Sequence, residues 1–97
     1  QQKAIDKIRS GVRISEVDFA ARGYIHSQGF GKCFGHSVGH GVGMEVHELP
    51  SVSRNNTGFL KSGMVITIEP AIYVPGFGGV RIEDMALVTD AGCEILT

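Results

Sequence analysis

Four glycines stand within the nine residues from Gly35 to Gly43, and they exclude a helix over this stretch. In a helix interior each glycine is less favourable than alanine by about 1 kcal/mol. The i, i+4 spacing of His36 and His40 is therefore not that of two ligands on one helix. In a regular extended strand an even spacing would point both histidines to one side. Glycines beside a histidine also let backbone and a ligand approach closely. The alternative is a glycine-rich turn with incidental histidines.

Two glutamates end or interrupt apolar runs further along the chain. Glu69 follows the run 65–68, and Glu83 stands between Ile82 and Asp84. An unpaired carboxylate is costly to bury. Glu69 is therefore expected to ligate a metal, to pair with a base, or to escape at a sheet edge. Arg81 and Glu83 fall on one strand face, and taken alone they predict a surface ion pair of little energetic weight.

In combination these side chains predict hydrolysis of a peptide bond on a divalent metal. One imidazole and two carboxylates suit zinc, manganese, cobalt or iron. Such a metal lowers the pKa of bound water and polarises a carbonyl group. Further histidines can donate to a developing oxyanion, and a guanidinium can hold a carboxylate. A nucleotide-binding loop fits poorly, because the glycines at 39, 41 and 43 lack the G-x-G-x-x-G spacing and no helix clearly follows.

The remaining pattern predicts two helices followed by antiparallel strands, which is an α+β fold. Apolar spacing places a helix end over 3–9 and a second helix over 15–28, where Ser15 and Asp18 resemble a capping box. Gly29 is expected to end the second helix. The predicted strands cover 65–69, 71–74, 80–83, 85–89 and 93–96, with 80–89 forming one long strand or two closely joined ones.

Composition excludes several classes of partner. The formal net charge is −1, and lysine and arginine do not cluster, so neither nucleic-acid nor membrane binding is expected. No apolar run approaches the roughly 20 residues of a membrane span. Cys33 and Cys93 lie far apart and are expected to be reduced thiols in a cytoplasmic protein. The first residue is not methionine, and the opening reads as mid-helix, which predicts a segment of a longer protein.

The chain resembles the metallopeptidases of the pita-bread fold, which include Xaa-Pro aminopeptidases, prolidases and methionine aminopeptidases. The resemblance rests on His-x-x-Gly-His-Gly-x-Gly, Val-His-Glu-x-Pro, Thr-Ile-Glu-Pro, Arg-Ile-Glu-Asp and Val-Thr-Asp-x-Gly-Cys-Glu-x-Leu-Thr, beginning at residues 36, 46, 67, 81 and 88. It implies the C-terminal half of that fold, with helices packed on a curved antiparallel sheet. Residues 1–97 would then be the C-terminal part of one catalytic domain whose upstream half is absent.

The same resemblance implies a metal centre. His40, Glu69 and Glu83 match the metal ligands, with Glu83 bridging two metals and Glu69 also handling the proton of the attacking water. Two divalent ions, manganese, cobalt or zinc, are implied for the full-length enzyme. The two aspartate ligands of the family lie upstream, and Asp6 and Asp18 lack their flanking pattern. We therefore expect this segment to hold at most one ion weakly, and to be inactive alone.

Three residues are implied to act on substrate. His47 resembles the histidine that contacts the scissile carbonyl or stabilises the tetrahedral intermediate. His36 and Arg81 resemble substrate-binding groups of the proline-specific branch, so the expected substrate is a dipeptide or peptide with proline in second position. Methionine aminopeptidase and a non-catalytic peptide- or partner-binding module on the same fold are the alternatives. Exposed sheet edges also leave open a self-associating homo-oligomer.

Overall fold

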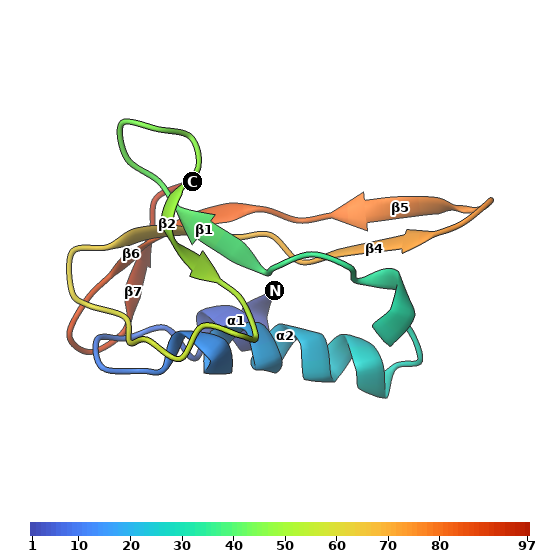
Figure 1. Ribbon diagram of the computed structural model, residues 1–97, viewed down its shortest axis with the longest axis horizontal. Coiled ribbons are helices and arrows are strands. Elements are labelled where there is room, and N and C mark those ends of the chain that lie inside the picture. Colours follow the sequence, from blue (N-terminus) through green and yellow to red (C-terminus); the bar gives the residue numbers. More distant parts are fainter.

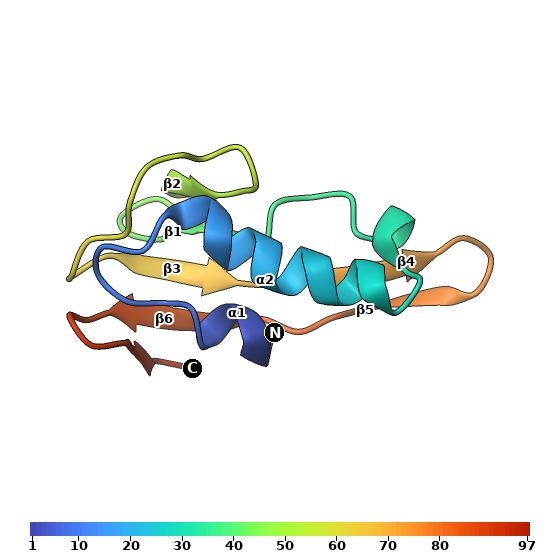
Figure 2. The ribbon, with the colours of Figure 1, turned by 90° about the horizontal axis from the view of Figure 1, so that it is seen from below.

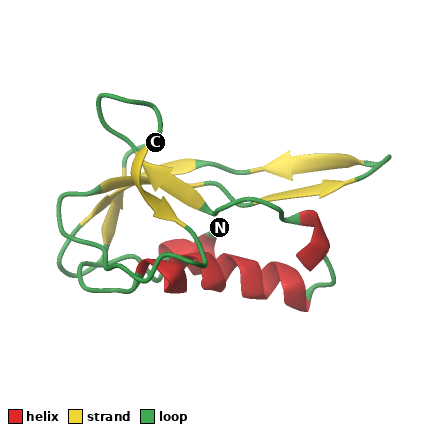
Figure 3. Cartoon of the chain, in the orientation of Figure 1, coloured by secondary structure: helices red, strands yellow, loops and turns green.

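Helices and strands occupy two separate layers in the computed structural model, which describes residues 1–97 (Figures 1 and 3). The predicted α+β fold is confirmed. The helices are α1 (Gln2–Ile5), α2 (Ile14–Ser27) and the short 3-10 helix η1 (Gly31–Cys33). The prediction of α2 is therefore right to within one residue at each end. The first helix is shorter than the predicted 3–9, because the chain turns away after Ile5 and the amide of Ser10 donates to the carbonyl oxygen of Thr89, just after β6.

The predicted capping box at Ser15 and Asp18 is wrong. Arg13 is the N-cap of α2, and its side chain makes no capping hydrogen bond. The amides of Ile14 and Ser15 instead donate to the carbonyl oxygens of Gly58 (2.8 Å) and Asn56 (3.0 Å). A distant loop thus satisfies the free amides of the helix start. Ser15 and Asp18 are both buried inside the helix.

The strands form an antiparallel five-stranded sheet and a separate two-stranded ribbon. The sheet has the order β2-β1-β3-β6-β7, and its strands are β1 (Gly39–Gly41), β2 (Glu48–Val52), β3 (Val65–Ile68), β6 (Asp84–Val88) and β7 (Cys93–Ile95). The ribbon consists of β4 (Ala71–Val74) and β5 (Gly78–Arg81), and it extends beyond the sheet (Figure 1). The predicted strands all form, with 80–89 divided between β5 and β6. Strands β1 and β2 are not among the predicted strands.

The two faces of strand β3 have different surroundings. One face packs into the hydrophobic core, and the other carries Thr67, which lines the candidate site. Ile66 and Ile68 point into the core, which α2 covers (Figure 2). Thr67 lies between them and, because side chains alternate along a strand, faces the other side of the sheet. The core also contains residues of both helices, the loops and the neighbouring strands: Ala4, Ile8, Val12, Ile14, Val17, Ala21, Ile25, Phe34, Val38, Val52, Leu60, Ala86 and Val88. Neither helix has the length and apolar character needed to cross a bilayer.

Both cysteines are free, and Cys93 packs against the core beside α1. Burial, and secondarily the negative charge of Asp6, raises the pKa of the Cys93 thiol. Since the thiolate is the reactive form, we expect Cys93 to react with iodoacetamide several-fold more slowly in the folded protein than in urea. Mass spectrometry of the alkylated peptide at a mildly alkaline pH measures both rates. Equal rates would contradict the raised pKa.

Candidate active site

A hollow of about 370 Å³ opens on the face of the sheet to which Thr67 points, opposite the hydrophobic core. Five of the six residues singled out from the sequence line it: His40, His47, Glu69, Arg81 and Glu83. They come from β1, the β1–β2 loop, the end of β3, the end of β5 and the β5–β6 connection. The antiparallel pairing of β3 with β1 and β6 brings these segments together.

The backbone around His40 fixes which ring nitrogen faces the hollow. Its amide donates to the hydroxyl of Thr67 (3.1 Å). Its Nδ1 lies 2.9 Å from the carbonyl oxygen of Gly41, which can only accept, so Nδ1 carries the proton of this hydrogen bond. Nε2 then faces the Oε1 atom of Glu69 at 3.0 Å. A backbone carbonyl that accepts from one ring nitrogen, with the other nitrogen directed into the site, is the usual arrangement of a metal-ligating histidine.

Glu69 is held by three partners, and its side chain is only 13% exposed. Besides His40, it accepts a hydrogen bond from the Thr67 hydroxyl (3.0 Å), and its Oε2 lies 3.8 Å from Nη1 of Arg81. These partners exclude one of the three fates predicted from the sequence, because the carboxylate pairs with His40 and Arg81 instead of escaping at a sheet edge. Arg81 is half exposed, so the ion pair with it is the weaker contact.

Glu83 lines the hollow but stays exposed. Arg81 pairs with Glu69 and not with Glu83, so the surface pair that their spacing suggested is wrong. No group of three His, Cys, Asp or Glu side chains has the spacing to hold a metal ion. The imidazole and carboxylates suit a divalent metal chemically, but only His40 and Glu69 are in contact in this structure.

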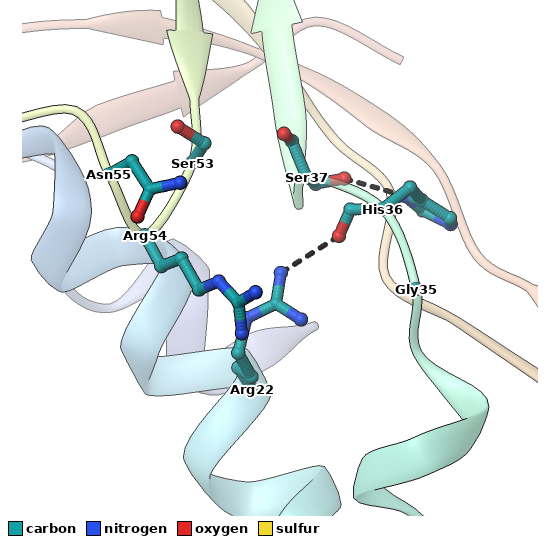
Figure 4. A pocket seen from close by; sticks show the side chains of 7 residues that line it. All are labelled: Arg22, Gly35, His36, Ser37, Ser53, Arg54 and Asn55. Carbon is teal, nitrogen blue, oxygen red and sulfur yellow. Dashed lines mark hydrogen bonds between the residues drawn. The ribbon is translucent and has the colours of Figure 1, made fainter.

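His36 lies apart from the hollow. Strand β1 begins only at Gly39, so the even-spacing argument does not extend back to His36. Its Nδ1 bonds the carbonyl oxygen of Ser37 (2.6 Å), and its ring packs edge-on against Phe34 at 5.0 Å. Its Nε2 is buried and has no hydrogen-bond partner. His36 borders a second, polar pocket of about 380 Å³ beside α2 (Figure 4).

The sequence reasoning missed Thr67, which joins the two central groups. The side chain is 1% exposed, accepts from the amide of His40 and donates to Glu69. Its position two residues before Glu69 places both on one strand face, and this spacing was the available signal. It also missed Asp18 and Arg22 of α2, whose i, i+4 spacing and opposite charges were visible.

Replacement of Thr67 by valine tests this link. Valine preserves the shape but leaves the His40 amide without its acceptor and removes one of the two partners of Glu69 Oε1. We therefore expect a loss of about 1–3 kcal/mol in the free energy of unfolding. Urea denaturation measures it. Thr57→Val is the matched control, because Thr57 is exposed, and it should change stability little. Equal stability of the two variants would contradict the linking role.

Comparison with known proteins identifies the family. The model of metallopeptidase family M24 matches residues 1–90. The chain belongs to metallopeptidase family M24. Among M24 proteins, the Xaa-Pro dipeptidase of Pyrococcus horikoshii is 52% identical over all 97 residues. This chain spans 28% of the length of that relative.

Solved M24 structures share the fold described above. The prolidase from Pyrococcus furiosus superposes with a TM-score of 0.97 at 49% identity, covering 100% of this chain and 29% of that one. The methionine aminopeptidase from Rickettsia prowazekii gives a TM-score of 0.74 at 27% identity, covering 97% of this chain and 46% of that one. The predicted pita-bread fold is confirmed. The chain is more similar to the prolidase than to the methionine aminopeptidase, both in structure and in sequence.

Proposed function

We propose that the protein carrying this chain hydrolyses Xaa-Pro bonds at the N-termini of peptides, and that residues 1–97 form the C-terminal part of its catalytic domain. The observation that carries the proposal is the hollow in which Nε2 of His40 lies 3.0 Å from Glu69, with Arg81 on the second carboxylate oxygen. The 52% identity to an Xaa-Pro dipeptidase supports the choice of substrate.

His40, Glu69 and Glu83 would hold the metal, and two divalent ions, manganese, cobalt or zinc, are proposed for the complete enzyme. When bound, such ions activate water and polarise the scissile carbonyl. Nδ1 of His40 is held by the Gly41 carbonyl, which keeps Nε2 available as a ligand. The low exposure of Glu69 suits a carboxylate that accepts the proton of the attacking water.

The other residues would act on the peptide. His47 is exposed on the β1–β2 loop, with its ring centroid 4.2 Å from that of His40. From there it can donate to the oxyanion of a tetrahedral intermediate. Arg81 at the rim supplies a guanidinium for a substrate carboxylate, the group that a dipeptide carries next to its scissile bond. His36 is the third proposed substrate contact; its Nε2 has no hydrogen-bond partner, but it is buried and lies outside the hollow.

The test uses the complete natural chain supplied with manganese, cobalt or zinc. Its substrates are an Xaa-Pro dipeptide, a longer Xaa-Pro peptide and a peptide that begins with methionine followed by alanine. We expect cleavage of the Xaa-Pro substrates, and their ratio distinguishes dipeptidase from aminopeptidase. Preferential release of methionine would favour the methionine aminopeptidase alternative. Metal uptake without cleavage of any substrate would contradict the proposal, and neither uptake nor cleavage would favour a non-catalytic binding module.

A further inference from the structure

An ion pair on α2, whose carboxylate is fully buried, contacts the segment that leads from His36 to His40. Asp18 is 0% exposed, and Arg22, one helical turn later, contacts both its carboxylate oxygens, with Nε at 2.7 Å and Nη2 at 3.0 Å. The two parallel bonds form the fork geometry that is specific to arginine and carboxylate. The guanidinium also stacks on the ring of Phe34 at 4.4 Å from its centroid.

The pair binds the backbone of residues 34–38 at three points. Arg22 donates from Nη1 to the carbonyl oxygen of Phe34 (3.1 Å) and from Nη2 to that of His36 (2.8 Å). The amide of Val38 donates to Oδ2 of Asp18 (3.1 Å). Figure 4 shows the Arg22 guanidinium directed at the His36 carbonyl, while the imidazole of His36 points away from it. The segment has no regular secondary structure of its own, so these bonds define its path.

The anchored segment leads directly to the hollow. The carbonyl oxygen of Val38 accepts the backbone amide of Glu69 (2.6 Å), and the next two residues are Gly39 and His40 of β1. The contacts therefore run from Asp18 through Val38 to Glu69, and from Arg22 to the backbone of His36. The proposed substrate contact His36 and the proposed metal ligand His40 thus both depend on α2 for the position of their backbone.

Stability alone does not explain why the carboxylate of this ion pair is buried. Burying a charged pair is expensive, and apolar residues of similar volume often stabilise a protein as well or better. Full burial of Asp18 with all its contacts on Arg22 and Val38 indicates that the pair specifies one conformation of the 34–38 segment. Side chains that determine geometry in this way matter because small displacements of a positioned group can reduce a rate greatly.

We propose that Asp18 and Arg22 are positioning residues of the active site, which hold His36 and His40 in place through the backbone of residues 34–38. The inference rests on the proposed function for its effect on substrate, but the geometry it describes can be tested without activity. Neither residue touches the hollow that contains Glu69.

The kinetic test uses the complete natural chain with Arg22→Lys, Arg22→Gln and the control Arg9→Gln, since Arg9 is exposed and its side chain has no partner. Lysine keeps a charge beside Asp18 but cannot bind both carbonyl oxygens and the carboxylate together. We expect Arg22→Lys to keep the melting temperature within a few degrees while raising KM for an Xaa-Pro dipeptide about tenfold, with kcat less affected. Unchanged KM in this folded variant would overturn the proposal.

A double-mutant cycle shows whether the effect passes through His36. If Arg22 positions His36, Arg22→Lys should raise KM clearly in the wild-type background and little in His36→Ala. Equal effects in both backgrounds would mean that Arg22 affects KM independently of His36, and would overturn the positioning role of this pair toward His36.

Amide hydrogen exchange provides the readout that does not need catalysis. In Arg22→Gln we expect the amides of Val38 and His40 to exchange at least tenfold faster, while those of Ile66 and Ile68 in β3 change little. A uniform increase at all four amides, or none at any of them, would overturn the positioning role. If the wild-type protein cleaves no Xaa-Pro substrate, the proposed function fails and the exchange pattern still decides this inference.

Discussion

Replacement of Glu69 by glutamine is expected to lower kcat/KM for Xaa-Pro hydrolysis in the complete natural chain by about a thousandfold or more. Glutamine keeps the shape and can still accept from the Thr67 hydroxyl. It cannot take a proton from water, and it removes the negative charge that faces His40 and Arg81. Loss of a general base alone lowers rates by roughly 10²–10⁴. A weaker metal site would add to this loss.

Glu94→Gln is the matched control, because Glu94 is an exposed carboxylate on β7 of the same sheet and makes no ion pair. Its kcat/KM should stay within about twofold of the wild type, as expected for an exposed site. Circular dichroism confirms that both variants are folded, and metal analysis after dialysis shows how much metal each retains. A Glu69→Gln variant with near-normal kcat/KM would exclude Glu69 from the reaction.

The sequence was sufficient for elements whose signals are local. Helix α2 and strands β3 to β7 followed from apolar spacing and turn residues. The grouping of His40, His47, Glu69, Arg81 and Glu83 followed from the family motifs, and the structure places all five around one hollow. These residues meet in space for a physical reason, because an antiparallel sheet aligns short segments so that their side chains share one face.

Two missed features, strand β1 and the contact of Asp18 with Val38, depend on contacts between distant residues. Strand β1 is three residues long with glycine at both ends, so it has almost no propensity of its own and forms because β2 and β3 pair with it. Asp18 looked like a capping residue, since acidic side chains are common in a first helical turn. Arg22 stands four residues later and was visible in the sequence, but the contact with the Val38 amide was visible only once residues 34–38 were placed beside α2.

Gly39→Ala is expected to destabilise the protein by about 3 kcal/mol or more. A methyl group on Gly39 would collide with the carbonyl oxygen of Thr67 and lie 2.7 Å from its carbonyl carbon. These are backbone atoms of the neighbouring strand, so β1 and β3 would have to separate, which exceeds the usual range of about 1–3 kcal/mol for an overfilled core. Urea denaturation measures the loss, and His40 should leave Glu69 as β1 shifts.

Gly35→Ala is the control, because it adds the same methyl group in the same glycine-rich segment but in open space. Its free energy of unfolding should stay within about 0.5 kcal/mol of the wild type. The pair of variants separates two explanations for the glycines that exclude a helix here. If both variants are equally destabilised, backbone freedom explains the glycines. If only Gly39→Ala is destabilised, the close approach of β1 to β3 explains Gly39, and the same approach places His40 beside Glu69.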